Sequence, residues 1–384
     1  MYNYKDLTIT IVGSGIAGAY AAGMLAKDQY NVILLDAAQP EQLPFLPVFP
    51  STYSKYMFLW SYLEKFQSEL IPAVRFVAPN GRSALVRLPH PILVLHRDKL
   101  QCYLQNFARQ SGASYYPLEA KVIQEEDLIV LEKEEIKFQA QFFIGAEGLS
   151  NLIRTHYFQN TEKTFSPKYS LVVFTVVDKR LEENFLTLQW LPQPQALIWS
   201  LPSGQHTVVG VKISPPLSAL FAEKTLQKYL RRVLGISSSP PFSQRYIPFL
   251  ATGEDGSVDI SQVMGPNWAL LGSAAGLSEP LMGVEIAAEI YSAYYFCDAF
   301  SAIRPSHYPR ALAENYLQHA MQIHSYLQAL SDPFRINRFV SVLRHSSELQ
   351  EIVASAFSQL SSSEQIPAKI RSRLLKILWQ RCLG

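Results

Sequence analysis

The first forty residues contain two short apolar runs separated by one helical stretch. Residues 7–12 are rich in β-branched side chains and are followed by a glycine, which predicts a buried parallel strand. Residues 19–26 have a helical pattern, and residues 31–35 form a second apolar run that ends at Asp36. Strand, helix and strand in this order predict a βαβ unit.

Four apolar segments in the middle of the chain have the length and spacing of strands in an antiparallel sheet. They are residues 170–178, 185–190, 196–201 and 207–213. From about residue 301 the pattern is helical. We expect one long helix over residues 308–330, and Asp332 with Pro333 marks its end.

Composition places the chain among globular proteins. It has 384 residues, of which 48% are hydrophobic and 17% charged, so a sizeable core is expected and a disordered or fibrous protein is excluded. The length suggests two domains, or one domain with a large insertion. A formal net charge of +2 argues against nucleic-acid binding across the whole surface.

Cysteine and histidine positions indicate neither a disulfide framework nor a metal site. The three cysteines, Cys102, Cys297 and Cys382, are far apart and lack zinc spacing. The polar start and the lack of roughly 18 consecutive apolar residues favour a cytoplasmic protein without a signal peptide or a membrane span.

The segment 366–384 is basic and has apolar residues near one helical face. It is compatible with a helix at a membrane surface that brings the protein to a lipophilic substrate. We favour the alternative, a C-terminal helix that packs on the body of the protein and keeps its lysines and arginines in solvent. Membrane contact, where it occurs, is therefore expected to be peripheral.

The turn after the first strand carries the strongest motif. Gly13 permits a tight turn, Gly15 lets the backbone approach a pyrophosphate, and Gly18 allows the helix to pack closely on the strand. The helix N-terminus offers N–H groups to phosphates, and Asp36 is placed to accept hydrogen bonds from an adenosine ribose. The motif predicts a dinucleotide site for FAD or NAD. Its turn residues are Gly13, Ser14, Gly15, Ile16, Ala17 and Gly18.

Three further segments narrow the choice of cofactor. Residues 141–154 contain an apolar run followed by Glu147 and Gly148, and Arg97 follows the predicted strand 91–95. Residues 268–288 read W-A-L-L-G-S-A-A-G-L-S-E-P-L-M-G-V-E-I-A-A. In this order and at this spacing, the segments resemble the flavoprotein monooxygenase superfamily, most nearly its geranylgeranyl-reductase-like branch. The resemblance covers about the first 300 residues.

The resemblance implies an α/β protein with a Rossmann-like FAD-binding domain, an inserted antiparallel-sheet substrate domain and a helical C-terminal region. The FAD domain is expected over 1–45, 95–165 and 255–300, the substrate domain over 46–94 and 166–254, and helices over 301–384. Besides the glycine turn, the implied FAD-binding residues are Asp36, Arg97, Glu147, Gly148, Gly272, Ser273, Pro280, Gly283, Val284 and Glu285.

The segment 194–211 is similar to a hairpin of the same reductases and to a signature of flavin-dependent halogenases. It makes Trp199 a candidate wall of the substrate pocket. A plain strand pair with Trp199 in the core is the alternative.

Several positions depart from the family pattern. Ser273 stands where the family usually has the aspartate that bonds the ribityl chain, and Glu147 replaces another aspartate. Asp36 is shorter than the usual glutamate, and Glu285 stands where glycine is frequent. The cysteine motif of geranylgeranyl reductases is missing from residues 47–56, so prenyl reduction does not follow from the motifs alone.

The leading functional hypothesis is an FAD-dependent oxidoreductase that passes hydride between flavin N5 and a hydrophobic, isoprenoid-like or aromatic small molecule. No second glycine motif is present, so NADH or NADPH would bind transiently. One alternative is a monooxygenase or halogenase that uses a flavin C4a-peroxide, although Lys55 alone does not establish a halogenase lysine. Another is a degenerate FAD-binding protein without redox activity. No catalytic acid or base is identified.

Overall fold

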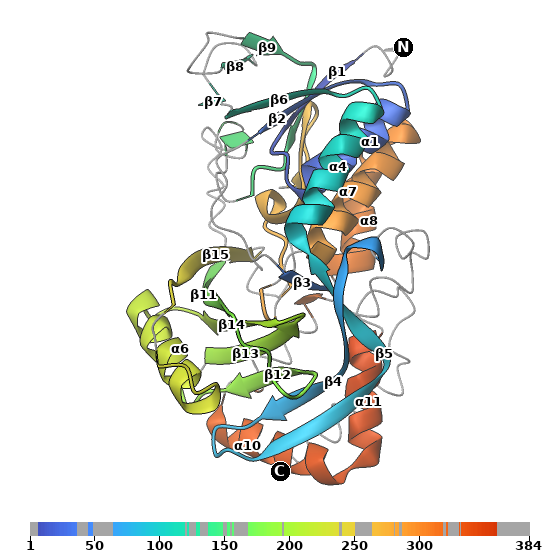
Figure 1. Cartoon of the computed structure of the whole chain (residues 1–384). Coiled ribbons are helices and arrows are strands. Elements are labelled where there is room, and N and C mark those ends of the chain that lie inside the picture. Colours follow the sequence, from blue (N-terminus) through green and yellow to red (C-terminus); the bar gives the residue numbers. More distant parts are fainter. Residues whose placement is uncertain are drawn as a thin grey trace.

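The computed structural model shows two sheets with helices packed around each (Figure 1). The structure describes residues 7–36, 45–48, 64–119, 121–122, 128–130, 137–148, 152–153, 156, 168–193, 196–237, 240–249, 263–279, 281–283, 286–317, 320–321, 330 and 332–358.

The first sheet is parallel and contains the predicted βαβ unit. Its order is β16-β10-β1-β2-β6. The strands are β1 (Thr8–Val12), β2 (Asn31–Asp36), β6 (Ser114–Glu119), β10 (Phe142–Gly145) and β16 (Trp268–Leu270). Helices α1 (Ile16–Lys27), α4 (Arg97–Gln110) and α7 (Ile286–Ser301) lie together beside this sheet (Figure 1). Because parallel strands end at one edge, β1, β2, β10 and β16 bring their following loops together.

A small antiparallel sheet adjoins the parallel one. It consists of β7 (Lys121–Val122), β8 (Leu128–Val130) and β9 (Lys137–Gln139).

The second large sheet has eight strands in the order β15-β11-β14-β13-β12-β4-β5-β3. They are β3 (Phe45–Val48), β4 (Gln67–Val77), β5 (Ser83–His96), β11 (Lys168–Val177), β12 (Phe185–Trp190), β13 (Ala196–Ser203), β14 (His206–Ile213) and β15 (Ser243–Phe249). A 3-10 turn, η2 (Glu64–Phe66), precedes β4. The four strands predicted from the hydrophobic pattern are all present.

The sheet is mixed, whereas the sequence predicted an antiparallel one. β12 pairs with β4 in parallel, with Phe185 opposite Ala73, and the other pairings in this sheet are antiparallel. The spacing of the four apolar runs within residues 170–213 indicates only how strands that follow one another along the chain pair. It carries no information about pairing with a strand from residues 67–77. The parallel pairing is therefore a tertiary contact that hydrophobic spacing does not encode.

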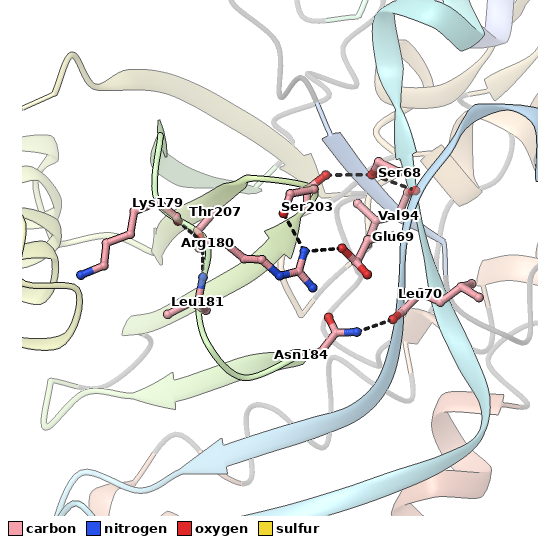
Figure 2. Close-up of polar contacts among 11 residues, drawn as sticks. Ser68, Glu69, Leu70, Val94, Lys179, Arg180, Leu181, Asn184, Ser203 and Thr207 are labelled. Carbon is pink, nitrogen blue, oxygen red and sulfur yellow. Dashed lines mark hydrogen bonds and ion pairs between the residues drawn. The ribbon is translucent and has the colours of Figure 1, made fainter.

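Polar contacts fasten β4 to the connections beside it (Figure 2). The Arg180 guanidinium donates to the Glu69 carboxylate at 2.5 Å and to the Gly204 carbonyl at 2.6 Å. Ser68 and Ser203 join their hydroxyls at 2.7 Å. These bonds fix the β13–β14 hairpin against β4 and hold the middle of the mixed sheet together.

The two faces of the mixed sheet have different coverings. One face, with Val173, Val209 and Val211, packs under α6 (Ala219–Val233) in a core of its own. The opposite face, with Val172 and Trp199, belongs to the main core that also includes the parallel sheet. This second face contacts Gly283, since a Cβ there would meet Val172 and Ile247.

The C-terminal region is helical in its described parts. α8 (His307–Leu312) continues into a π-helical turn, η5 (Ala313–Leu317), so the helix predicted over 308–330 is not regular at its start. Residues 318–319 and 322–329 of that prediction lie outside the described residues. α10 (Pro333–His345) begins at the predicted signal, because the Asp332 carboxylate accepts the Phe334 N–H at 2.8 Å. α10 and α11 (Ser347–Ser358) pack on β5 (Figure 1). Within the described part of the chain, every helix is too short or too polar to cross a lipid bilayer.

Candidate functional site

The glycine turn between β1 and α1 is packed tightly at two of its glycines and open at the third. Gly13 has φ +106°, and a Cβ built there would lie 2.3 Å from the Ala146 carbonyl oxygen. A Cβ on Gly18 would lie 1.8 Å from the Gly13 carbonyl oxygen. A Cβ on Gly15 meets nothing within 4 Å. Gly13 and Gly18 therefore allow close packing, and the open space at Gly15 is a cradle that a pyrophosphate fits.

The N-terminus of α1 has no side-chain cap at Gly15. Ile16 and Ala17 form its first turn and are buried. Helix N-termini with uncapped N–H groups attract anionic oxygens. The N-terminus of α1 and the open space at Gly15 therefore both favour an anionic group such as a pyrophosphate.

Asp36 is held beside the glycine turn by a short relay of hydrogen bonds. The Ser14 hydroxyl donates to Asp36 Oδ1 at 2.8 Å. Gln105 of α4 donates to the Ser14 hydroxyl at 2.9 Å and to the Ser14 carbonyl at 3.0 Å. The relay positions the Asp36 carboxylate at the end of β2, where the motif predicts a ribose contact. Gln105 was not predicted.

The loop after β10 is closed by Glu147. Its buried carboxylate accepts the Ile153 N–H at 2.9 Å through Oε1. Gly148 follows with φ +66°. Glu147 therefore shapes its own loop, which accounts for a longer side chain at this position.

Residues 272–279 and 281–283 are buried and lie near the junction of the two sheets (Figure 1). η4 (Gly272–Ala275) follows β16, and the Gly272 N–H donates to the Ser292 hydroxyl of α7 at 2.8 Å. Ser273 is buried within this turn. Pro280, Val284 and Glu285 lie outside the described residues, so their predicted roles stay predictions.

Glu279 folds the end of this segment around its own carboxylate. Oε1 accepts the Leu281 N–H at 2.6 Å, and Oε2 accepts the Met282 N–H at 2.7 Å. Burial raises the pKa of Glu279, and the Met282 N–H and the nearby Lys212 oppose this rise. A buried carboxyl group is thus placed in the segment that the resemblance assigns to the flavin edge.

Lys212 of β14 faces the same segment. It lies in register opposite Val172 and Leu197, on the face of the mixed sheet that belongs to the main core. Burial lowers the pKa of Lys212 to about 8, although the Glu279 carboxylate acts in the opposite direction. Neither Lys212 nor Glu279 was predicted from the sequence. The sequence did offer a signal for Lys212, because it occupies a position of the predicted strand 207–213 that alternation directs toward the core.

Close packing joins Gly283 to the mixed sheet. A Cβ built on Gly283 would lie 2.2 Å from Cδ1 of Ile247 and 3.3 Å from Cγ2 of Val172. The segment that resembles a flavin-binding loop therefore contacts an apolar surface directly.

Trp199 lies on that same face of the mixed sheet. Its side chain is 1% exposed, and its ring covers Gly210, where a Cβ would lie 2.3 Å from a ring carbon. Among the described residues its indole N–H has no hydrogen-bond partner. The residue is part of the core, and its role as a pocket wall stays a prediction.

Arg97 and Glu289 form an ion pair at the first turns of α4 and α7. Arg97 Nη2 donates to Glu289 Oε1 at 2.9 Å, and the two side chains are 5% and 8% exposed. Arg97 opens α4, as predicted. Glu289 was not predicted, and it lies against Gly272, since a Cβ there would be 3.3 Å from Glu289 Cγ.

Comparisons with known proteins agree with this architecture. No protein-family model matches the chain. Digeranylgeranylglycerophospholipid reductase 3 of Methanosphaera stadtmanae is 22% identical over 299 residues, which cover 73% of this chain and 74% of that protein. A geranylgeranyl bacteriochlorophyll reductase-like structure from Thermoplasma acidophilum matches with a TM-score of 0.75 at 16% identity, over 97% of this chain and 99% of that one. The tryptophan halogenase from Shewanella frigidimarina matches with a TM-score of 0.65 at 15% identity, over 99% of this chain and 94% of that one.

The fold is therefore that of the Rossmann-like FAD-binding reductases, as predicted. The relatives and structural neighbours are geranylgeranyl-reductase-like proteins and flavin-dependent oxidoreductases and halogenases. The chain is similar to geranylgeranyl-reductase-like proteins in sequence and in fold, which agrees with the resemblance carried by the motifs.

The residues present fit FAD. The open cradle at Gly15 accommodates a pyrophosphate, and Asp36 stands at the end of β2 for the adenosine ribose. Two buried nitrogens of Arg97, Nε and Nη1, have no hydrogen-bond partner among the described residues, so they are available to a ligand.

Proposed function

We propose that this protein is an FAD-dependent oxidoreductase that transfers hydride to a hydrophobic, isoprenoid-like small molecule. The observation that carries the proposal is the contact of Gly283 with Val172 and Ile247. It places an apolar sheet face against the segment expected to hold the flavin edge. The names of the relatives, which are reductases of geranylgeranyl compounds, support the same substrate class.

The chain's own residues position the cofactor. The turn from Gly13 to Gly18 would bind the pyrophosphate, Asp36 the adenosine ribose, and residues 279–283 the ring edge. Bound FAD supplies hydride chemistry. The apolar face with Val172 and Ile247 would align a hydrocarbon chain and exclude water from it.

Lys212 is the residue best placed to manage a proton. Reduction of a carbon–carbon double bond requires a hydride at one carbon and a proton at the other. Lys212 Nζ holds a proton beside the 279–283 segment, and a pKa of about 8 makes that proton transferable near neutral pH. We assign Lys212 the role of proton donor. The Glu279 carboxylate raises the pKa of Lys212 and so favours its protonated form.

The reductant and the location are parts of this proposal. NADH or NADPH would bind transiently and reduce the flavin. The basic segment 366–384 would bring the protein to a membrane surface that holds a lipophilic substrate. The segment 366–384 lies outside the described residues. Lys55, the lysine considered for the halogenase alternative, also lies outside them. Vesicle binding by the full chain and by a chain lacking 366–384 tests the membrane contact, and equal binding would discard it.

Anaerobic flavin reoxidation tests the proposed reaction. FAD-loaded protein is reduced, first with NADH or NADPH and separately with dithionite, and is then mixed with a geranylgeranyl lipid. The proposal predicts that oxidised flavin returns without oxygen and that saturated product forms. Reoxidation by oxygen alone, with hydroxylated or halogenated product, would favour the monooxygenase or halogenase alternative instead.

A further inference from the structure

The ion pair of Arg97 and Glu289 is buried but incompletely bonded. Arg97 Nη2 reaches Glu289 Oε1 at 2.9 Å. Among the described residues, Arg97 Nε, Arg97 Nη1 and Glu289 Oε2 have no hydrogen-bond partner. Neither side chain is more than 8% exposed. Within the part of the chain that the structure describes, three buried polar atoms of charged groups are therefore left for a further partner.

Leaving such atoms without partners destabilises a protein. A buried charged group without its hydrogen bonds costs more free energy than a neutral one, and an ion pair compensates only when its remaining donors and acceptors are satisfied. The pair offers two N–H donors on one side and a carboxylate acceptor on the other. A ligand with neighbouring hydroxyl groups satisfies both sides, because a hydroxyl donates and accepts.

The location of Glu289 indicates which part of a ligand it meets. A Cβ built on Gly272 would lie 3.3 Å from Glu289 Cγ and 3.6 Å from Ala17 Cβ. The Glu289 side chain thus stands where η4, α7 and the first turn of α1 converge. Gly272 directly precedes Ser273, where the family pattern has an aspartate for the ribityl chain.

We infer that Glu289 supplies from α7 the carboxylate that Ser273 does not, and that it binds a ribityl hydroxyl of FAD. Arg97 orients Glu289 through Oε1, which leaves Oε2 for the ligand. Glu289 lies in the first turn of α7, where the helix dipole stabilises its charge. The inference rests on the proposed FAD-binding function and assigns a binding residue within it.

A purely structural pair that ties α4 to α7 is the competing explanation. Both explanations predict some loss of stability when Glu289 is changed. Only the ligand explanation predicts that a carboxylate restored at position 273 compensates for its loss.

FAD titration of the apo-protein, followed by flavin fluorescence, distinguishes the two. Glu289→Gln should weaken FAD binding by roughly tenfold to a hundredfold, the range of a charge-assisted hydrogen bond. Adding Ser273→Asp to Glu289→Gln should recover most of the affinity. Glu69→Gln, which breaks the Arg180 ion pair in the mixed sheet, is the matched control and should bind FAD as the natural protein does.

Two further measurements keep the test decisive. Where Glu289→Gln fails to fold, Glu289→Asp retains the charge and shortens the reach, and Ser273→Asp should likewise restore its affinity. An FAD analogue lacking the contacted ribityl hydroxyl should bind the natural protein and Glu289→Gln equally. FAD binding unchanged in Glu289→Gln, or no recovery with Ser273→Asp, overturns this inference alone. A natural protein that takes up no FAD overturns the proposed function itself.

Discussion

Lys212 on β14 and Glu279 in the segment before α7 lie close enough for each charge to shift the pKa of the other. Sixty-six residues of chain separate them, and the mixed sheet packs on Gly283, four residues after Glu279. Burial acts against both charges, and their mutual attraction partly offsets it. The pair places a titratable ammonium group beside the expected flavin edge.

The first prediction concerns the pH dependence of folding. Burial lowers the pKa of Lys212 in the folded protein from the ordinary lysine value of 10.5 to about 8. Between these pH values the unfolded chain binds a proton that the folded chain does not, so stability rises with pH through this window. Lys212→Met should remove this rise, which amounts to at most about 3 kcal/mol. Urea unfolding from pH 8 to 10.5 measures it.

Lys224 of α6 provides the control for that experiment, because its side chain is exposed. Lys224→Met should leave the pH profile of the unfolding free energy as it is in the natural protein. A profile that is also unchanged in Lys212→Met would contradict the lowered pKa of this ammonium group.

The second prediction tests the coupling between the two charges. Since the Glu279 carboxylate raises the pKa of Lys212, Glu279→Gln should lower that pKa further below 8. Lysine-selective NMR titration reports it directly. Glu314→Gln, which breaks an exposed pair with Arg310, should leave the Lys212 titration in place. An unshifted Lys212 in Glu279→Gln would mean that the two charges do not interact.

The third prediction separates packing from ligand binding within the glycine turn. Gly18→Ala places a Cβ 1.8 Å from a backbone oxygen and should cost several kcal/mol of stability, about the range of severe overpacking. Gly15→Ala meets nothing within 4 Å and should change stability by less than about 1 kcal/mol while weakening FAD binding. Thermal unfolding and FAD titration of both variants check this. Unchanged FAD affinity in Gly15→Ala would contradict the prediction that the pyrophosphate binds in the open space at Gly15.

The fourth prediction concerns the substrate sheet. Gly210→Ala would place a Cβ 2.3 Å from the Trp199 ring and should destabilise the protein by about 1–3 kcal/mol. Adding Trp199→Leu should relieve the clash, so the double variant should be more stable than the two separate losses predict. Urea unfolding of the four proteins in this cycle gives the coupling. Additive losses would show that Trp199 does not cover Gly210.

Hydrophobic periodicity, capping residues and glycine spacing predicted the strands, helix starts and turns that they determine over a few residues. Residues 185–190 form the predicted strand without adjustment, and Asp332 with Pro333 starts α10 through a hydrogen bond to Phe334. Gly13, Gly15 and Gly18 were interpretable because their spacing along the chain determines their spacing in the turn. Hydrophobic period and capping chemistry act over a few residues, so one sequence suffices for them.

The remaining features arise from contacts between distant parts of the chain. Arg97 and Glu289 are 192 positions apart, and nothing near Glu289 marks it as more than a polar residue in a helix. The parallel pairing of β12 with β4 is likewise invisible to periodicity. Ser273 looked like a weakened FAD contact in the sequence. The structure brings Glu289 of α7 against the preceding residue, Gly272.

The most direct test of the central claim is the visible absorption spectrum of the purified full-length protein, with identification of the flavin released on denaturation. We predict an oxidised-flavin spectrum and FAD bound one to one, either as purified or after addition of FAD. A colourless protein that takes up no added FAD would contradict the account and favour a degenerate protein that has kept the fold without the cofactor.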